Sequence, residues 1–573
     1  PSTGHSELVL SDGHFLIEDG SFFGFATNAP PAEQQITLDG VRLRHEHVPY
    51  LDSTQWSASA LLVDGSERTL QILGQSLLED TNLRNADRGR IEVGRNSSDT
   101  DLTLLNSALM VSEGSSPSVI LTNAGLSNGL LTFNANEFSD SALTCAIDQL
   151  DPGFEAGTFA VSSFLIRLEG DLNRLGDLRI DGSFCYDPLI DQAKAVQETV
   201  SSAVYADGFF AFPGDLLTLQ VRDNSSLALS GTLDHNGLID AGTRSASECL
   251  VDGQVELIGE GGWKMGAGRI RGIMPADDPS VVPDEVDRLV IGADQVFFNP
   301  ALETSELEIE NQGTLLGAVL DYDQATFSDP ADSSYQAALN RVILTNRGII
   351  QPSYGTNAGG LAQEPFGGGT IDNEGGIIDL GGSVADPRQF VFDDVRVVGG
   401  EIAIGTFWGQ AATDAFWGNP QSGDPEEGIL NAIREGLATG GSDGGGARDT
   451  QFIDVTFTCP LKPALTTSEF LELLAGDGFL PTPNTLGYTA LGPTPPLSGI
   501  IALGSGNGVV LNNTTLNAHC SFGLIAVEGS LTIDDGVIVA FERLDVSSAN
   551  YEITFGTGSQ LILGPLGGGT VLT

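Results

Sequence analysis

The sequence predicts an all-β fold, a parallel β-helix (solenoid) with small helical insertions. The clearest evidence lies in the last fifty residues, where the apolar segments LIAV, LTI, VIV, LDV, EITF and LIL start at positions 524, 531, 537, 544, 552 and 561. Strands this short and this closely spaced do not fit ordinary hairpins, but they fit coils that each contain about three strands. The alternative, a β-sandwich, would have longer strands about 8–12 residues apart and visible two-residue turns.

A second observation is a repeated corner. The octapeptide VILTNAGL at Val119–Leu126 returns as VILTNRGI at Val342–Ile349, with weaker copies at Ile309–Leu315 and Ile371–Ile377. Each copy places Asn, one free position and Gly between two apolar segments. Both residues tolerate a positive φ and Asn can bond its own backbone, so the motif predicts a turn between short strands.

The spacing of these corners supports the same architecture. The Asn positions 311, 346 and 373 are 35 and 27 residues apart, which are coil-sized steps with loops of uneven length. LNNTTLNAHC at Leu511–Cys520 places Asn and Thr between leucines, and we expect these polar side chains to form ladders along the stack.

Three segments break the strand pattern and predict helices. Asp187–Val204 and Asp424–Gly441 each begin with Asp-Pro, a favourable cap and first turn, and Thr466–Gly478 carries a capping box. We therefore expect N-terminal coils, a helical insertion, central coils, an insertion with two short helices and a Pro-rich loop around one strand, and C-terminal coils, with boundaries at 1–186, 187–215, 216–420, 421–497 and 498–573.

Composition excludes several partners. Acidic residues outnumber basic ones by 77 to 25, which gives a net charge of −52. Nucleic acids and anionic membrane surfaces require clustered Lys and Arg, so neither is expected as a partner. Only three lysines occur, and so acidic a surface is best tolerated where salt screens it. This indicates a saline (halophilic or marine) or Ca²⁺-bearing exterior, with an acidic extracellular protein of an ordinary habitat as the alternative.

The chain ends and cysteines indicate export. The sequence starts at Pro1 without a charged and apolar leader, which we interpret as a mature N-terminus after signal-peptide removal, or a trimmed chain. No stretch approaches the roughly 18 apolar residues of a spanning helix, so no membrane insertion is expected. The five cysteines show no CxxC spacing, which argues against zinc and allows one or two disulfides plus one free thiol.

The strand-and-corner texture, in stretches such as LTNAGLSNGLLTF, VILTNRGII and FVFDDVRVVGGEIAIG, resembles the right-handed parallel β-helix superfamily of pectin-lyase-like proteins. The resemblance is one of architecture and reaches no named family within it. Polygalacturonase-like members would carry NTD, paired Asp, GHG and RIK motifs, of which only the pair Asp393 and Asp394 is present. Paired carboxylates can perform acid–base chemistry on a glycosidic bond, but adjacent strand residues point to opposite faces.

Candidate metal ligands are few. His45 and His47 alternate along LRHEHV and would share a strand face, although surface histidines are the commoner interpretation. Ca²⁺ is the one candidate cofactor, because oxygen-rich loops suit it. Neither acidic cluster has the spacing of a known calcium loop, so solvated acidic loops are the alternative; the clusters are Asp321, Asp323, Asp329 and Asp332, and Asp277, Asp278, Asp284, Glu285 and Asp287.

Two functions follow. The first is an exported, non-catalytic structural protein that assembles with itself, head to tail, into a cell-surface or extracellular filament, sheath or layer. The second is a polysaccharide-acting β-helix enzyme (a glycoside hydrolase or lyase) or a tailspike-like adhesin, with a cell-surface polysaccharide as partner. The sequence favours the first, since it shows no coherent catalytic constellation and no regular aromatic stripe.

The structural function predicts where subunits meet. The open end of a β-helix presents unpaired N–H and C=O groups, and neither end of this sequence shows a capping helix. We expect Leu8–Phe25 and Ile553–Leu572 to lie in head-to-tail contacts, which do not close and so give a filament. Deletion of the tail Gly564–Thr573 is expected to shorten the assemblies.

Overall fold

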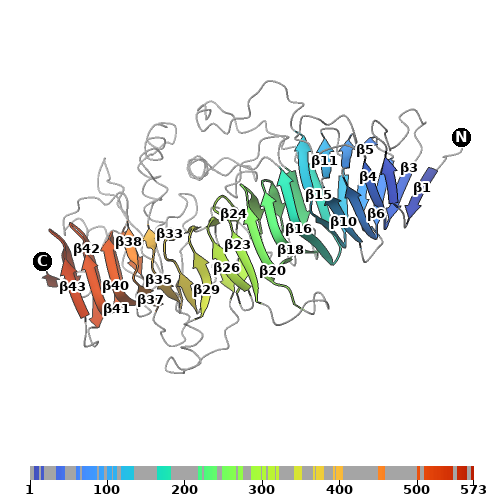
Figure 1. The fold of residues 1–573 in the computed structure, drawn as a ribbon. Coiled ribbons are helices and arrows are strands. Elements are labelled where there is room, and N and C mark those ends of the chain that lie inside the picture. The colour runs from blue at the N-terminus through green and yellow to red at the C-terminus, as the bar shows by residue number, and fades with distance from the viewer. Residues whose placement is uncertain are drawn as a thin grey trace, which may run out of the picture. The chain divides into compact units, whose positions relative to one another are not determined.

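The computed structural model of the protein is shown in Figure 1. It describes residues 6–11, 14–17, 34–45, 60–64, 68–79, 81–86, 90–95, 100–105, 107–112, 118–134, 164–181, 217–221, 225–241, 248–265, 269–274, 286–298, 300–304, 307–316, 318–321, 341–351, 366–367, 369–379, 392–393, 395–403, 450–458, 500–503, 509–545, 551–563 and 570–572. The chain divides into two compact units: unit 1 contains residues 1–186 and 210–297, and unit 2 contains residues 187–209 and 298–573.

The first 24 strands belong to unit 1, whose boundary falls within the last of them. They are β1 (Ser6–Ser11), β2 (His14–Ile17), β3 (Gln34–Asp39), β4 (Arg42–His45), β5 (Ala60–Asp64), β6 (Arg68–Leu73), β7 (Gln75–Glu79), β8 (Asn82–Ala86), β9 (Arg90–Val93), β10 (Thr100–Leu105), β11 (Ala108–Ser112), β12 (Ser118–Thr122), β13 (Ala124–Ser127), β14 (Leu130–Asn134), β15 (Phe164–Glu169), β16 (Leu172–Asp181), β17 (Leu217–Val221), β18 (Ser226–His235), β19 (Leu238–Asp240), β20 (Glu248–Ile258), β21 (Gly262–Lys264), β22 (Arg269–Gly272), β23 (Asp287–Ile291) and β24 (Val296–Phe298).

Unit 1 is built from three parallel columns of strands, so each coil contributes one strand to each column. The first column contains β1, β3, β6, β9, β12, β15, β17, β19 and β21. The second contains β2, β4, β7, β10, β13, the first halves of β16, β18 and β20, and β22. The third contains β5, β8, β11, β14, the second halves of β16, β18 and β20, and β23.

The core of unit 1 lies between these columns and consists of stacked aliphatic side chains. Strands in register place equivalent residues one above another, and the inward positions of the first column form an uninterrupted apolar row. The row is fully or almost fully buried and contains Leu38, Ile72, Val93, Leu121, Leu168 and Val221. Such stacking explains the short β-branched and leucine-rich segments, because each contributes only two or three inward side chains.

The remaining strands belong to unit 2. They are β25 (Ala301–Glu303), β26 (Leu307–Asn311), β27 (Thr314–Leu316), β28 (Val319–Asp321), β29 (Val342–Asn346), β30 (Ile349–Gln351), β31 (Phe366–Gly367), β32 (Thr370–Asp372), β33 (Ile377–Asp379), β34 (Phe392–Asp393), β35 (Arg396–Val398), β36 (Glu401–Ala403), β37 (Thr450–Ile453), β38 (Thr456–Thr458), β39 (Ile500–Leu503), β40 (Val509–Asn517), β41 (His519–Ile533), β42 (Ile538–Asp545), β43 (Tyr551–Phe555), β44 (Gln560–Leu563) and β45 (Thr570–Leu572).

Unit 2 repeats the three-column plan. One column contains β26, β29, β32, β35 and β37, and continues into β40, β41 and β42. A second contains β27, β30, β33, β36 and β38, the later parts of β40 and β41, and β43. The third pairs β25 with β28, and farther along the chain it runs from β39 through the starts of β41 and β42 to β44. The core of unit 2 includes four phenylalanines in successive contact, with neighbouring ring centroids 5.3–6.0 Å apart: Phe452, Phe457, Phe522 and Phe541.

The all-β, parallel solenoid expected from the sequence is confirmed, and the β-sandwich alternative is wrong, because neighbouring strands are parallel rather than joined as hairpins. Figure 1 shows β16, β18 and β20 side by side in this arrangement. Several expected short strands are continuous: LIAV and LTI both belong to β41, which bends around a corner. No helix occurs in the described ranges, and the three predicted helical segments, 187–204, 424–441 and 466–478, lie outside them.

The repeated corner has two different structures. Asn123 adopts a φ of 49° and its Oδ1 accepts the N–H groups of Asp171 and Leu172 in the following coil, at 2.5 and 3.3 Å. Asn346 is instead fully buried and does not have a positive φ, yet the predicted corner between two short strands is present there, between β29 and β30. The glycine two positions later is needed for closeness: a Cβ on Gly348 would lie 2.1 Å from the Gly313 carbonyl oxygen.

The cysteine expectation also needs correction. Cys249 and Cys520 are both buried thiols outside any disulfide, and burial raises the pKa of the Cys249 thiol to about 12. The Cys520 thiol donates to the Ala518 carbonyl at 3.2 Å. Only three of the five cysteines remain that could form disulfides, so at most one disulfide is possible. The expectation of two disulfides plus one free thiol is therefore wrong. Cys145, Cys185 and Cys459 lie outside the described residues.

Candidate functional site

Most residues singled out as catalytic or metal-binding candidates lie at the limits of the described chain. Asp393 ends β34, and Asp394 lies outside the described residues. His45 ends β4 and Asp321 ends β28, and only their backbones are described. The other candidates lie outside the described residues: His47, Asp323, Asp329, Asp332, Asp277, Asp278, Asp284 and Glu285. Within the described ranges, no three His, Cys, Asp or Glu side chains gather as a metal site would require.

Asp287 is the one member of the second acidic cluster whose side chain is described. It is buried, and its two carboxylate oxygens accept the N–H of Gly253 at 2.8 Å and that of Ile273 at 3.0 Å. The Ile273 N–H also donates to the Val251 carbonyl at 2.9 Å, so it is shared between the two acceptors. These contacts give Asp287 a role in holding two neighbouring segments of unit 1 together.

A ladder of buried amides runs through unit 2 at the Asn corners. Asn311 Nδ2 donates to Asn346 Oδ1 at 2.8 Å, and Asn346 Nδ2 donates to Asn373 Oδ1 at 2.6 Å. Asn373 Nδ2 reaches the carbonyls of Gly399 and Glu401 at 3.3 Å each, and all three Asn side chains are fully buried. The coil-to-coil equivalence of these corners is confirmed, although the polar ladder was expected at Leu511–Cys520.

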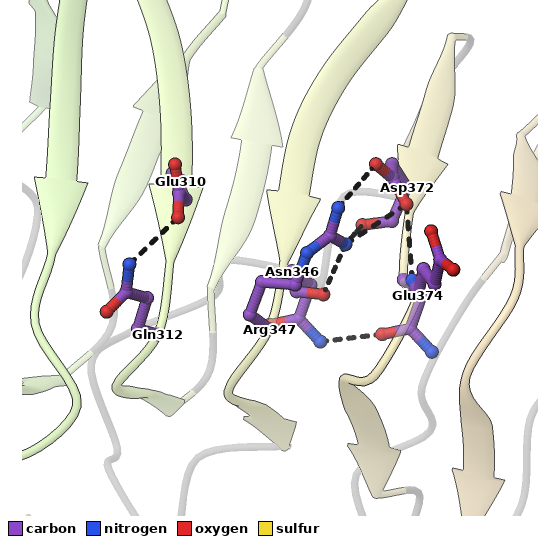
Figure 2. Close-up of polar contacts among 7 residues, drawn as sticks. Glu310, Gln312, Asn346, Arg347, Asp372 and Glu374 are labelled. Carbon is purple, nitrogen blue, oxygen red and sulfur yellow. Dashed lines mark hydrogen bonds and ion pairs between the residues drawn. The ribbon is translucent and has the colours of Figure 1, made fainter.

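An ion pair lies directly outside the ladder, as Figure 2 shows. Arg347 Nη2 lies 2.8 Å from Asp372 Oδ2, and its Nη1 donates to Asp372 Oδ1 at 3.1 Å. The bond from Arg347 holds the pKa of the Asp372 carboxyl below its usual value. Glu310 and Glu374 add negative charge near this one guanidinium. The pair spans consecutive coils and is about one-third exposed on each side, so it adds little stability.

Unit 1 contains a buried aromatic cluster of a different kind. His235 lies edge-on to Trp263, with ring centroids 5.2 Å apart, and Trp263 stacks on Phe297 at 5.1 Å. Trp263 Nε1 donates to Gln295 Oε1 at 2.8 Å, and His235 Nε2 contacts the Gly262 carbonyl at 3.1 Å. Every member is fully buried or nearly so. The cluster is part of the core and offers no access to a substrate.

A shallow groove of about 510 Å³ lies on the outer surface of unit 1, across successive coils. Asn128 and Asp177 adopt φ values of 53° and 45° there, and Asp177 Oδ1 accepts the Thr232 N–H at 2.9 Å. Arg179 and Asp234 form an ion pair at 3.6 Å. The lining also includes the exposed Leu105 and the buried Leu178. Mixed charges beside two leucines suit a neutral ligand better than an anion.

The most unusual surface is the apolar face of β43 in unit 2. Tyr551, Ile553 and Phe555 pair in register with Gly529, Leu531 and Ile533 of β41. Leu531 and Ile533 are fully buried, yet Tyr551 and Phe555 are 46% and 40% exposed. Paired residues on parallel strands share a face, so these aromatics occupy inward positions that no described segment covers.

The neighbouring strand β44 is covered. β45 pairs antiparallel with it, with Leu561, Ile562 and Leu563 opposite Leu572, Val571 and Thr570. The side chains of Leu561 and Ile562 are only 1% and 2% exposed. The expectation that the tail leaves the last coil wholly uncapped is therefore wrong at β44. An antiparallel strand was missed because TVL alone carries no signal for direction.

The first described coil of unit 1 has a partly covered inward face as well. Leu10 of β1 pairs with Leu38, and Phe15 of β2 pairs with Leu43. Leu38 and Leu43 are buried, whereas Leu10 and Phe15 are only half-buried. The short apolar segments of the sequence predicted strands at both ends of the chain. They could not predict which inward side chains are exposed, because that depends on the segments that cover them.

The comparisons with known proteins add no relative. No family model, no curated protein and no solved structure matches the chain.

Proposed function

We propose that the protein is an exported, non-catalytic structural protein of the cell surface or extracellular space, which associates with copies of itself end to end. The proposal includes the right-handed coil of pectin-lyase-like proteins as its architecture and a saline exterior as its setting. The net charge of −52 supports such a setting, because salt would screen repulsion between neighbouring copies. Among the described residues there is no helix long and apolar enough to cross a membrane.

The observation that carries the proposal is the uncovered inward face of β43. The coils of unit 2 hold together by parallel backbone pairing and by stacking of inward side chains, and β43 presents both features to whatever lies beyond it. The N-terminal coil of a second copy offers the complementary elements, the pairing edge of β1 and the half-buried Leu10 and Phe15. A contact between different surfaces of two copies can repeat, and where it does so end to end, without closing into a ring, it continues into a filament.

The expected gain per contact is modest. Full burial of a large apolar side chain contributes about 1.5–3 kcal/mol, so covering the exposed portions of two aromatics contributes roughly 2 kcal/mol. Backbone pairing along one strand adds about 0.5–1.5 kcal/mol for each hydrogen bond. The sum is offset by the entropy lost on association, so we expect assembly that depends on concentration and salt.

The substitution Phe555→Asp tests this contact. It places a charge on the uncovered apolar face, and we expect association, followed by sedimentation velocity in saline buffer and by negative-stain microscopy, to weaken by at least about tenfold, which is about 1.4 kcal/mol. Ile258→Asp is the matched control: Ile258 is also 40% exposed, and the variant has the same net charge. The full chain should form filaments or sheets, and Ile258→Asp should behave like it.

Two results would overturn the proposal. A full chain that stays monomeric up to its solubility limit in saline buffer has no end contact of the proposed kind. Equal weakening by Phe555→Asp and Ile258→Asp would mean that added charge, rather than the β43 face, controls association.

A polysaccharide-binding function, as in a glycan-acting enzyme or a tailspike-like adhesin, is favoured by one observation, the groove around Asp177 and Arg179. It predicts that the protein is retarded in gels that contain a neutral polysaccharide, and that Arg179→Ala abolishes the retardation. Arg42→Ala is the control, because Arg42 also forms a partly exposed ion pair, with Glu79 at 2.6 Å, away from the groove. Retardation that both variants retain would exclude this groove.

A further inference from the structure

We propose that β45 is a displaceable cover that keeps a second copy from pairing with β44. The inference rests on the proposed end-to-end association and specifies its contact. While β45 is in place, a neighbouring copy meets the backbone edges of β43 and of the end of β42, Arg543–Asp545, but not that of β44. Once β45 is displaced, the edge of β44 becomes available as well.

Direction of pairing is the first argument. The paired columns of unit 2 are parallel, and β44 itself pairs parallel with β42 over Ile538–Phe541. β45 is antiparallel to β44 and occupies the edge on which the next parallel strand would lie. The edge of β44 therefore cannot accept another coil until β45 leaves it. Natural sheets commonly protect an edge from intermolecular pairing in this way.

Burial is the second argument. β43 and β44 belong to the same last coil, but their side chains differ in coverage. Leu561 and Ile562 of β44 are almost fully buried, whereas Tyr551 and Phe555 of β43 are 46% and 40% exposed. Of these two strands, only β44 is paired on both sides among the described residues. The strand that is paired on both sides is thus also the one with buried side chains, as expected if β45 helps to cover it.

The cover is weakly held. The pairing involves three residues on each strand, and none of the three residues of β45 is charged. Each backbone hydrogen bond contributes about 0.5–1.5 kcal/mol, while ordering each residue costs about 1–2 kcal/mol. These contributions nearly cancel, so a second copy that offers a longer parallel strand can compete with β45 for the same edge.

Val571→Pro in the full chain tests the cover. Proline removes one N–H and fits poorly in a paired strand, so β45 should separate from β44. We expect the concentration at half-maximal association, measured by sedimentation velocity, to fall by about tenfold, the effect of roughly one additional net hydrogen bond. Val571→Thr, which keeps a β-branched residue and its N–H, should associate like the unmodified chain. Deletion of Gly564–Thr573 should act like Val571→Pro, which is opposite to the shortening expected from the sequence.

A second pair of measurements guards against misfolding. Hydrogen exchange of the Gln560–Leu563 amides should accelerate in Val571→Pro while the β41 amides stay protected. The double variant Ile562→Cys with Val571→Cys joins directly opposite residues, and oxidation should keep association at or below that of the unmodified chain.

The two proposals fail differently. If Phe555→Asp weakens association but Val571→Pro leaves it unchanged or weakens it, the cover is refuted and the end contact stands. If Val571→Pro exposes β44 by hydrogen exchange and neither it nor the full chain associates, both proposals are wrong.

Discussion

Replacement of Asn346 by leucine is expected to destabilise unit 2 by about 2–5 kcal/mol. The substitution keeps the branched shape of the side chain, although leucine is larger, and it removes both of the ladder bonds that Asn346 makes, to Asn311 at 2.8 Å and to Asn373 at 2.6 Å. Among the described residues, Asn373 Oδ1 then has no donor, and Asn311 Nδ2 keeps a 3.4 Å contact with the Ile349 carbonyl. A buried polar group without a partner costs about 1–3 kcal/mol; the Asn373 oxygen loses its donor, and the Asn311 amide loses the better of its two acceptors.

Urea unfolding followed by far-UV circular dichroism measures this loss. Gln312→Ala is the control, because Gln312 is an exposed amide next to Asn311 that bonds only Glu310 at 2.8 Å among the described residues. We expect Gln312→Ala to change stability by no more than about 0.5 kcal/mol.

A triple variant distinguishes a polar ladder from simple packing. Leucine at Asn311, Asn346 and Asn373 together removes the partners along with the unpaired groups, so part of the loss should be recovered relative to Asn346→Leu. A triple variant whose loss equals the sum of three independent losses would show that the amides do not act as a ladder.

The fold was readable from the sequence because a solenoid repeats its constraints locally. Closely spaced apolar segments predicted the coils, and the spacing of Asn311, Asn346 and Asn373 predicted their equivalence, which the ladder confirms. The conformation of each corner was not readable, since Asn123 and Asn346 occur in almost identical octapeptides. Asn123 accepts bonds from the next coil in a left-handed conformation, whereas Asn346 points into the core, because different neighbouring coils offer them different partners.

The candidate site could be predicted only in part. Terminal coils were visible as strand texture, but pairing direction is a property of two segments and not of one. The antiparallel β45 therefore had no signature in GGGTVLT, and the exposure of Tyr551 and Phe555 followed only from the register with β41. The isolated carboxylates of the sequence likewise gave no indication that Asp287 would be buried against two backbone amides.

A second large effect is expected from pH, through His235 in unit 1. Its ring is fully buried, Nε2 donates to the Gly262 carbonyl, and Nδ1 has no hydrogen-bond partner among the described residues. Burial is the main cause that lowers the pKa of His235 from 6.5 to about 4, and the bond to Gly262 opposes it only partly. Charging this imidazole in the folded state is therefore strongly unfavourable.

The direction of the effect follows from proton binding. Between pH 6.5 and about 4 the unfolded chain takes up a proton at this histidine and the folded chain does not, so stability falls as the pH falls. Above the unfolded pKa the group contributes no pH dependence. The interval of roughly 2.5 pH units corresponds to a loss of roughly 3 kcal/mol once the pH reaches the folded pKa.

His235→Phe isolates this contribution from the carboxylates, whose protonation changes the repulsion within a chain of net charge −52. The stability difference between the native protein and His235→Phe should be constant above pH 7 and should shift by roughly 3 kcal/mol in favour of the variant between pH 6.5 and 4. Trp263→Phe is the control: it loses the bond to Gln295 and should be less stable at every pH, yet retain the slope that belongs to His235. A slope unchanged in His235→Phe would mean that folding does not lower the pKa of His235, and it would refute the burial of a neutral imidazole.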